Sequence, residues 1–258
     1  MTLRISVCEL PDSRIELEPA WENLTQHVRF AESGLVVLPE LPAAAWFGAT
    51  PTFDQGRWDE VVAAHGRLLD GLSIFGSATV VTSIAETVDG VRRNVAVAWS
   101  RATGVVRLQA KTILPEEPGF HEQSWYVAGT VAPSVVDIQG VRIGVLLCSE
   151  LMATDRARWL GRAGAQVICV PRATGASDTW VVAGRMAAIA SGAYVLSSNR
   201  NGQGATPEAA FGGRGLIVDP EGVVLGETSR AKPFATAGLD LAVADAAKLT
   251  YPRYLTIP

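Results

Sequence analysis

Residues 141–148 read Val-Arg-Ile-Gly-Val-Leu-Leu-Cys, a nearly continuous apolar run that ends on a thiol. Such runs are typical of strands that are buried on both faces in α/β proteins. Two other runs also end on chemically active residues: residues 35–40 read Leu-Val-Val-Leu-Pro-Glu, and residues 105–111 read Val-Val-Arg-Leu-Gln-Ala-Lys. Because open α/β sheets place their sites at strand ends, we predict that this thiol, carboxylate and amine surround one reacting carbon.

The segments around these three runs alternate between strand and helix patterns. The chain begins with the order strand, helix, strand, and the turns at residues 88–90 and 102–104 are typical of hairpins. Parallel connections and hairpins together predict an α/β fold with mixed sheets. The expected strands are residues 3–7, 35–38, 77–84, 94–100, 105–109, 141–148, 166–170, 193–199, 216–218 and 223–225, and the expected helices are residues 20–31, 57–72, 155–163 and 179–191.

The composition is that of a globular protein with a large core. The 258 residues are 48% hydrophobic and 19% charged, without a low-complexity linker, so we expect one domain over residues 1–258. We find no signal peptide and no apolar run long enough to span a bilayer, so we expect no membrane partner. The net charge of −4 and the lack of a basic block interleaved with aromatic residues argue against nucleic acid. A small molecule is the expected partner.

The cysteines and histidines do not indicate a disulfide framework or a metal site. Three cysteines without a close pair predict a reduced, cytoplasmic protein. The three histidines lack ligand spacing, so we expect no metal. The glycine-rich residues 212–215 lack the context of a phosphate-binding loop and are interpreted as a turn.

Each of the three terminal residues also has a simpler interpretation. Cys148 suits a nucleophile on a strand-to-helix turn, with the backbone N–H of Ser149 directed at an oxyanion, but a free cysteine is often a small buried hydrophobe. Glu40 suits a general base at the edge of a dry core, or a solvated loop acid. Lys111, the only lysine among the first 231 residues, suits a fixed cation or an ordinary surface lysine.

The residues that flank these positions resemble the carbon-nitrogen hydrolases of the nitrilase superfamily over nearly the whole chain. The resemblance rests on Leu-Pro-Glu at residues 38–40 and on an acid two residues after Cys148. It also rests on Lys111 followed by Leu-Pro, and on Pro-Gly-Phe-His-Glu at residues 118–122. Further similar blocks are residues 185–194, Asn199-Arg200 and residues 215–222.

The resemblance implies a four-layer αββα sandwich and a Glu-Lys-Cys triad at Glu40, Lys111 and Cys148, with Glu122 as an additional acid that orients Lys111 or water. It further implies cofactor-free hydrolysis of a small linear amide or N-carbamoyl compound through a thioester, with Lys111 and the Ser149 backbone N–H on the oxyanion. True nitrile hydrolases typically carry Trp where Ser149 stands, which favours amides. The alternatives are a nitrilase, an acyl transferase, or a silent member that only binds. A solvated loop acid is the alternative for Glu122.

Three further residues are candidates for contacting the substrate. Arg172 follows the expected strand 166–170, and we interpret it as binding a carboxylate or another polar end of the substrate; the alternative is an ion pair with a nearby acid. Trp125 and Tyr126 are candidate apolar walls, although aromatic residues are more often core. Since members of the superfamily pair through their helical layers, we expect a homodimer or larger homo-oligomer, with residues 246–258 as a tail extending across the interface.

Overall fold

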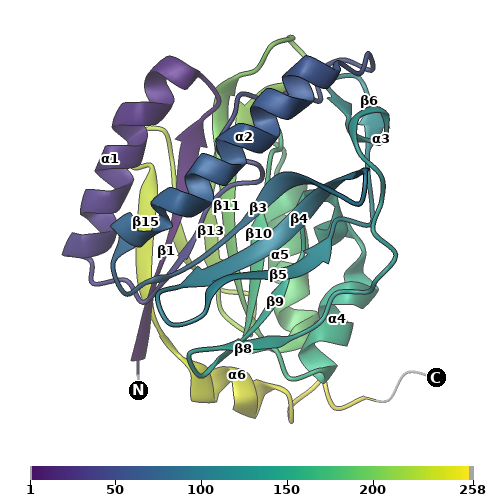
Figure 1. The fold of residues 1–258 in the computed structure, drawn as a ribbon. Coiled ribbons are helices and arrows are strands. Elements are labelled where there is room, and N and C mark those ends of the chain that lie inside the picture. The colour runs from purple at the N-terminus through teal and green to yellow at the C-terminus, as the bar shows by residue number, and fades with distance from the viewer. Residues whose placement is uncertain (1, 256–258) are drawn as a thin grey trace.

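The computed structural model describes residues 2–255, in which thirteen strands form one hydrogen-bonded system and two more form a separate hairpin. The main path runs β5-β4-β3-β2-β1-β11-β10-β9-β8, with β15 beside β1, and β12 and β13 beside β11 (Figure 1). The strands are β1 (Thr2–Pro11), β2 (Leu35–Val37), β3 (Thr79–Val88), β4 (Val91–Ser100), β5 (Gly104–Ala110), β6 (Glu116–Glu117), β7 (Phe120–His121), β8 (Val136–Ile138), β9 (Val141–Val145), β10 (Val167–Pro171), β11 (Tyr194–Gln203), β12 (Ala210–Gly212), β13 (Leu216–Val218), β14 (Val224–Glu227) and β15 (Phe234–Asp240). The helices are α1 (Arg14–Phe30), α2 (Gln55–Gly71), α3 (Glu122–Trp125), α4 (Thr154–Arg162), α5 (Thr179–Ser191) and α6 (Leu241–Ala247), with 3-10 turns η1 (Leu72–Phe75) and η2 (Cys148–Met152).

The system divides into two halves that face each other across an apolar core. Strands β1 and β11 pair in parallel only between Glu9 to Pro11, the last residues of β1, and Asn199 to Asn201, and this short junction joins the halves. On either side of it, Val37 and Val81 of the first half pack in one cluster with Val145 and Leu196 of the second. This inner core brings together residues more than 100 positions apart in the sequence.

Helices cover the outer face of each half. Leu24 and Val28 of α1 pack in one cluster with Val36 and Val80 of the first half, and residues of α2 lie against the same cluster. On the other side, Leu160 of α4 and Ala188 of α5 pack with Ile168 and Val195 of the second half. The two pairs of helices lie on opposite sides of the strands (Figure 1). The predicted α/β sandwich with mixed sheets is confirmed, and its layers are arranged αββα.

Several boundaries differ from the sequence predictions, and the reasons are local. The apolar run 141–148 is strand only to Val145, because Cys148 turns into η2. Helix α1 begins at Arg14, whereas the predicted helix began at residue 20. The first six residues of α1 were missed because they are mostly exposed and show no apolar period. Strand β15 was not predicted, because its residues Phe-Ala-Thr-Ala-Gly-Leu-Asp alternate only weakly in hydrophobicity. Helix α5, in contrast, has the predicted bounds.

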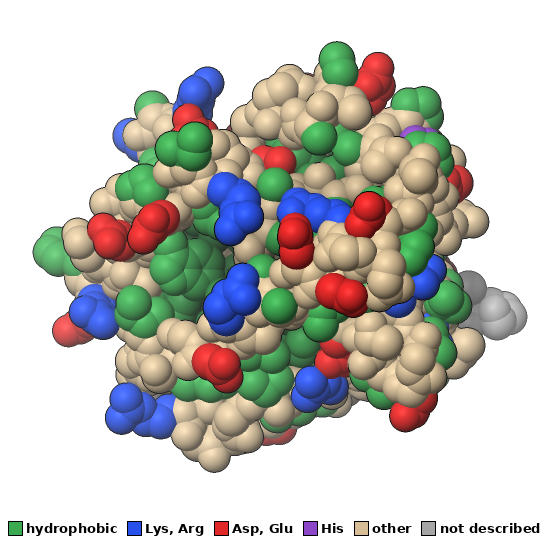
Figure 2. Space-filling view, turned by 45° about the horizontal axis from the view of Figure 1, so that its top comes forward, with side chains coloured by type: hydrophobic (Ala, Val, Ile, Leu, Met, Phe, Trp, Pro, Cys, Tyr) green, Lys and Arg blue, Asp and Glu red, His purple; other side chains and the backbone are tan. Residues whose placement is uncertain are grey.

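The outer face of the α1 and α2 layer is hollowed. A groove of about 620 Å³ between the two helices is lined by Leu17, Trp21 and Leu68, with Arg14 and Arg67 among its polar residues. Figure 2 shows hydrophobic side chains gathered in a hollow, with basic side chains beside it. Within residues 2–255, no helix combines the length and hydropathy that crossing a membrane requires.

Candidate active site

The structure brings the three predicted residues together at one end of the two sheet halves. Glu40 lies three residues after β2, Lys111 follows β5 directly, and Cys148 begins η2 three residues after β9. All three are almost fully buried, with exposed fractions of 0%, 1% and 4%. The surface interpretations of Glu40 and Lys111 are therefore wrong.

Lys111 lies between two carboxylates. Its Nζ donates to Glu40 Oε1 at 2.8 Å and to Glu122 Oε1 at 2.6 Å, and Glu122 is itself only 1% exposed. Burial alone lowers the pKa of Lys111, but the charges of Glu122 and Glu40 outweigh it and hold that pKa above its ordinary value. Burial raises the pKa of Glu122 to about 7, against the opposing effect of Lys111. Lys111 is therefore a fixed cation, and Glu122 is not a solvated loop acid.

Asn94 orients the carboxylate of Glu40. Its Nδ2 donates to Glu40 Oε1 at 2.8 Å and lies 3.4 Å from the hydroxyl of Tyr126. The other oxygen, Glu40 Oε2, is buried and accepts no hydrogen bond from the described residues. An oriented carboxylate with one unused oxygen is suited to accept a proton. Sequence reasoning missed Asn94; the available signal was a polar residue at the start of an apolar strand.

Cys148 has a strained backbone and a protonated thiol. Its φ of 50° lies in the left-handed region, which costs a non-glycine residue roughly 1–2 kcal/mol. Burial, and then the charge of Glu40, raise the pKa of the Cys148 thiol above its ordinary value, while Lys111 acts in the opposite direction. The thiol needs a base to become a nucleophile, and Glu40 is the nearby group suited to that role.

Glu150 ties the turn at Cys148 to the segment after Lys111. Its Oε2 accepts from the backbone N–H of Leu147 at 2.9 Å, and its Oε1 accepts from the N–H and hydroxyl of Thr112 at 2.9 and 2.7 Å. Arg156 of α4 donates to the same Oε1 at 2.8 Å. The carboxylate is fully buried. Four hydrogen bonds to one carboxylate therefore fix the nucleophile turn relative to the lysine.

The backbone N–H of Ser149 lies in the first turn of η2, where helical N–H groups have no partner within the helix. The Ser149 hydroxyl donates to the carbonyl of Ile113 at 2.6 Å, which anchors the turn. This geometry leaves the N–H available to an oxyanion beside Cys148.

Arg200 holds the loop that carries Glu40. Its Nε donates to the carbonyl of Glu40 at 3.1 Å, its Nη1 donates to the carbonyl of Ala44 at 2.9 Å, and its Nη2 donates to the carbonyl of Leu41. Asp12 neutralises this buried guanidinium. The sequence pattern singled out Asn199-Arg200 but did not indicate that Arg200 supports the base.

Arg172 and Trp125 lie in buried surroundings. Arg172 is 2% exposed and donates to the Ser197 hydroxyl at 2.6 Å, to the Thr174 hydroxyl at 2.8 Å and to the carbonyl of Arg214 at 2.7 Å. No carboxylate of residues 2–255 pairs with Arg172, so the alternative interpretation of Arg172, an ion pair with a nearby acid, is wrong. Trp125 belongs to an aromatic cluster and donates to the carbonyl of Thr50 at 2.7 Å.

This arrangement brings together a thiol, a carboxylate, a buried cation and a backbone N–H group. The described part of the chain contains no group of three or more His, Cys, Asp or Glu side chains placed to hold a metal ion. Residues of these types are suited to covalent catalysis at an electrophilic carbon.

Comparisons with known proteins identify the family of this chain and support its fold. The family model for carbon-nitrogen hydrolase matches residues 4–249. A deaminated glutathione amidase from Rattus norvegicus is 25% identical over 131 residues, which are 50% of this chain but only 40% of the rat protein. A citrullinase from Francisella tularensis is 22% identical over 89% of this chain and 85% of its own length.

The fold is also shared with solved structures. A carbon-nitrogen hydrolase from Helicobacter pylori G27 superposes with a TM-score of 0.84 at 22% identity, covering 98% of this chain and 94% of that one. An amidase from Nesterenkonia sp. superposes with a TM-score of 0.75 at 20% identity, covering 94% and 92% of the two chains.

Proposed function

The chain belongs to the carbon-nitrogen hydrolase family, and from this premise we propose that it hydrolyses the C–N bond of a small linear amide or N-carbamoyl compound through a thioester on Cys148. The observation that carries the proposal is the buried group of Glu40, Lys111 and Glu122 beside a protonated thiol. Relatives that are named as amidases support the amide class.

In the first half of the proposed reaction, Glu40 accepts the thiol proton while Cys148 Sγ attacks the carbonyl carbon. The carbonyl oxygen gains the negative charge, which Lys111 and the Ser149 backbone N–H stabilise. Collapse of this intermediate breaks the C–N bond, and the proton held by Glu40 passes to the leaving nitrogen. The products of this half are ammonia or an amine and an acyl thioester on Cys148.

In the second half, Glu40 accepts a proton from water as the water oxygen attacks the thioester carbon. The C–S bond then breaks, and the sulfur recovers the proton from Glu40, so the acid is released and the resting site is restored. Asn94 keeps Glu40 oriented through both halves, and Glu122 holds Lys111 in place.

The proposal is tested by measuring ammonia release by the wild-type protein over aliphatic amides, aromatic amides, N-carbamoyl amines, N-carbamoyl amino acids and nitriles. We expect turnover of amides or carbamoyl compounds and none of nitriles, with an acyl adduct on Cys148 visible by intact mass under rapid quench. Adduct formation without release of free acid, reversed by added amines, would instead identify an acyl transferase. Absence of both release and adduct across the panel would contradict the proposal.

We further propose that Arg172 binds an anionic end of the substrate, because it is a buried cation without a carboxylate partner among the described residues. Replacing Arg172 by Met should raise KM for N-carbamoyl amino acids by roughly 10-fold or more, the value of one charge-assisted hydrogen bond. KM for neutral amides should change little.

Arg172→Lys keeps the charge but not the planar donor group, and serves as the second variant if Arg172→Met unfolds. It should restore part of the affinity for the anionic substrate. If both variants alter KM for anionic and neutral amides equally, Arg172 has a structural role only.

We also propose a homodimer or larger homo-oligomer in the reduced cytoplasm. Val182 on the outer face of α5 is 63% exposed, and the tail exposes Leu249, Tyr251 and Tyr254. Of the predicted tail, residues 256–258 lie outside the described residues. Three buried free thiols support a reducing compartment.

Light scattering after gel filtration should give at least twice the chain mass of 27.3 kDa. Val182→Glu should shift the protein toward the monomer, because it places a charge in the apolar interface, whereas Val88→Glu on a distant hairpin should not. A wild-type protein that remains monomeric at micromolar concentration would contradict the oligomer.

A further inference from the structure

A second set of polar side chains, unrelated to the triad, lies where α4 meets the end of α5. A cavity of about 210 Å³ there is lined by four basic residues, Arg158, Arg162, Lys248 and Arg253, and by no acidic residue. Its remaining lining is small: Gly161, Gly164, Ala190 and Ser191. We call this cavity the basic pocket. A Cβ on Gly161 would clash with the carbonyl of Ser191, so this glycine lets the two helices approach closely at the pocket.

Two of the four basic side chains have structural roles. Arg253 donates to the carbonyls of Ala247 and Ile189 and pairs with Glu221. Lys248 donates to the carbonyl of Ala244 at 2.9 Å and to that of Gly192 at 3.3 Å. These contacts cap the carboxyl ends of α5 and α6, where cations are favoured. They explain why Arg253 and Lys248 are present, but not why two more arginines lie beside them.

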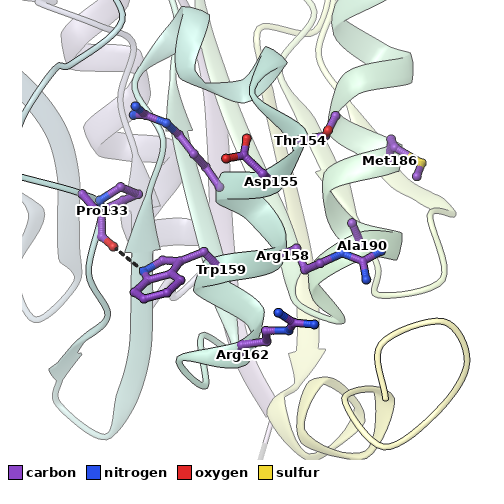
Figure 3. Close-up of a pocket in the computed structure, with 10 residues that line it drawn as sticks. Pro133, Thr154, Asp155, Arg158, Trp159, Arg162, Met186 and Ala190 are labelled. Carbon is purple, nitrogen blue, oxygen red and sulfur yellow. Dashed lines mark hydrogen bonds between the residues drawn. The ribbon is translucent and has the colours of Figure 1, made fainter. Parts of the chain in front are cut away.

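Arg158 is the side chain without such a role. Its Nη1 is buried and has no hydrogen-bond partner among the described residues. Arg162 is exposed and has one contact, from Nη2 to the carbonyl of Leu255 at 3.2 Å. Both extend from α4 toward Ala190 near the end of α5 (Figure 3). A buried guanidinium nitrogen is expected to have an acceptor, and here the acceptor must come from outside the described residues.

The nearby acids leave Arg158 and Arg162 without a carboxylate partner among the described residues. Glu221 neutralises Arg253 of the pocket, and Asp245 pairs with Arg142 outside it. Asp155 lies three residues before Arg158 on α4, yet it forms no ion pair within residues 2–255. Burial lowers the pKa of Lys248 to about 8, and although Asp245 opposes this shift, Arg142 and Arg253 add to it. The local field is therefore positive.

A larger groove adjoins the basic pocket and shares Arg158, Arg162 and Ala190 with it. This groove has a volume of about 700 Å³ and is lined on its apolar side by Pro133, Trp159 and Met186. The indole N–H of Trp159 donates to the carbonyl of Pro133 at 3.1 Å, which holds the ring in place although the residue is 58% exposed (Figure 3). A fixed aromatic face beside two arginines suits an anion attached to an apolar or aromatic group.

We propose that the basic pocket binds a phosphate group, either free or carried by a small organic molecule whose apolar part lies along Trp159. Arginine is the side chain best matched to phosphate oxygens, since its donors form a planar fork, and the two charges of Arg158 and Arg162 balance those of a phosphate monoester dianion. The site goes beyond the proposed hydrolytic function and does not depend on it, because none of its residues belongs to the triad.

Calorimetric titration of the purified full-length protein tests this site with two probes, inorganic phosphate and phenyl phosphate, and with benzyl alcohol as a neutral comparison. We expect both phosphates to bind, phenyl phosphate more tightly, and benzyl alcohol not to bind. Arg158→Gln and Arg162→Gln should each weaken phosphate binding at least 10-fold. Arg101→Gln removes the same charge from an exposed hairpin and should leave binding unchanged. Trp159→Ala should weaken the binding of phenyl phosphate and leave the binding of inorganic phosphate unchanged.

Two outcomes would overturn the site. Equal phosphate affinity in Arg158→Gln and the wild type would place binding elsewhere, and no heat with either phosphate at millimolar concentration would exclude it. Light scattering of the same variants tests whether a second copy of the chain, rather than phosphate, contacts the basic pocket. If Arg158→Gln loses the oligomer and the wild type binds no phosphate, the arginines belong to an interface between copies. Phosphate affinity unchanged in Cys148→Ala would separate this site from the catalytic centre, whatever that variant does to ammonia release.

Discussion

Replacing Cys148 by Ala is expected to lower kcat for the best amide by at least about 10⁴-fold, because the variant has no atom that can form the thioester. Folding should be retained. The substitution removes one buried sulfur, and it should lower the free energy of unfolding by about 1 kcal/mol. Ammonia release and thermal unfolding, measured on the same preparations, check both parts.

Cys169→Ala is the matched control. Cys169 is another fully buried free thiol, and burial also raises its pKa, but it lies on β10 within the inner core. Its loss should leave the rate of ammonia release within about twofold of wild type while costing similar stability. A Cys148→Ala protein that releases ammonia at the wild-type rate would disprove the thioester, and equal losses in both variants would indicate a general effect of thiol removal on folding.

Replacing Lys111 by Met is the second change with a large expected effect, and it acts on stability as well as activity. Met fills a similar volume, but it leaves Glu40 and Glu122 buried without their shared cation. Breaking a buried ion pair in this way costs about 3–5 kcal/mol. At roughly 2–4 °C per kcal/mol for a chain of this size, Tm should fall by about 10 °C. Activity should be lost as well, because no cation remains for the oxyanion.

Two further variants separate these effects. The double variant Lys111→Met with Glu122→Gln removes one of the two buried carboxylates that have lost their cation. It should therefore be more stable than Lys111→Met alone, but it should remain inactive. Lys232→Met changes the same residue type at an exposed position and should shift the free energy of unfolding by less than about 0.5 kcal/mol. If Lys111→Met melts at the wild-type temperature, the two carboxylates do not carry the charges assigned to them.

The pattern of apolar runs was sufficient to predict the strands that lead to Glu40, Lys111 and Cys148, but not β8, β12 or β15. Helix α5 lies between Asp178 and the left-handed Gly192, which mark its two ends, and the strands that lead to Glu40 and Lys111 are short apolar runs, so their positions follow from local sequence. The candidate site residues Glu40, Lys111, Glu122 and Cys148 could be predicted because each lies in a short sequence motif. The four motifs come from separate parts of the chain, but each can be recognised by itself.

Long-range support could not be predicted from single segments. Asn94 and Arg200 contact Glu40 across 54 and 160 residues, and no local pattern encodes such a separation. The left-handed backbone of Cys148 was also hidden, because an apolar run that continues to the cysteine has the appearance of an unbroken strand. The alternative interpretation of Arg172, an ion pair with a nearby acid, is wrong because the partners of its guanidinium are hydroxyls and a carbonyl.

The short junction between β1 and β11 makes the active site sensitive to mutations far from it. Glu40 and Lys111 follow strands of one sheet half, while Cys148 follows β9 of the other, so the base and the nucleophile are held at a working distance by the packing between the halves. The inner core sets the spacing between the two sheet halves. Removing a methyl group from Val145 or Leu196 would let the halves shift relative to each other without changing a residue of the active site. Variants of this core are therefore expected to lose turnover before they lose their fold.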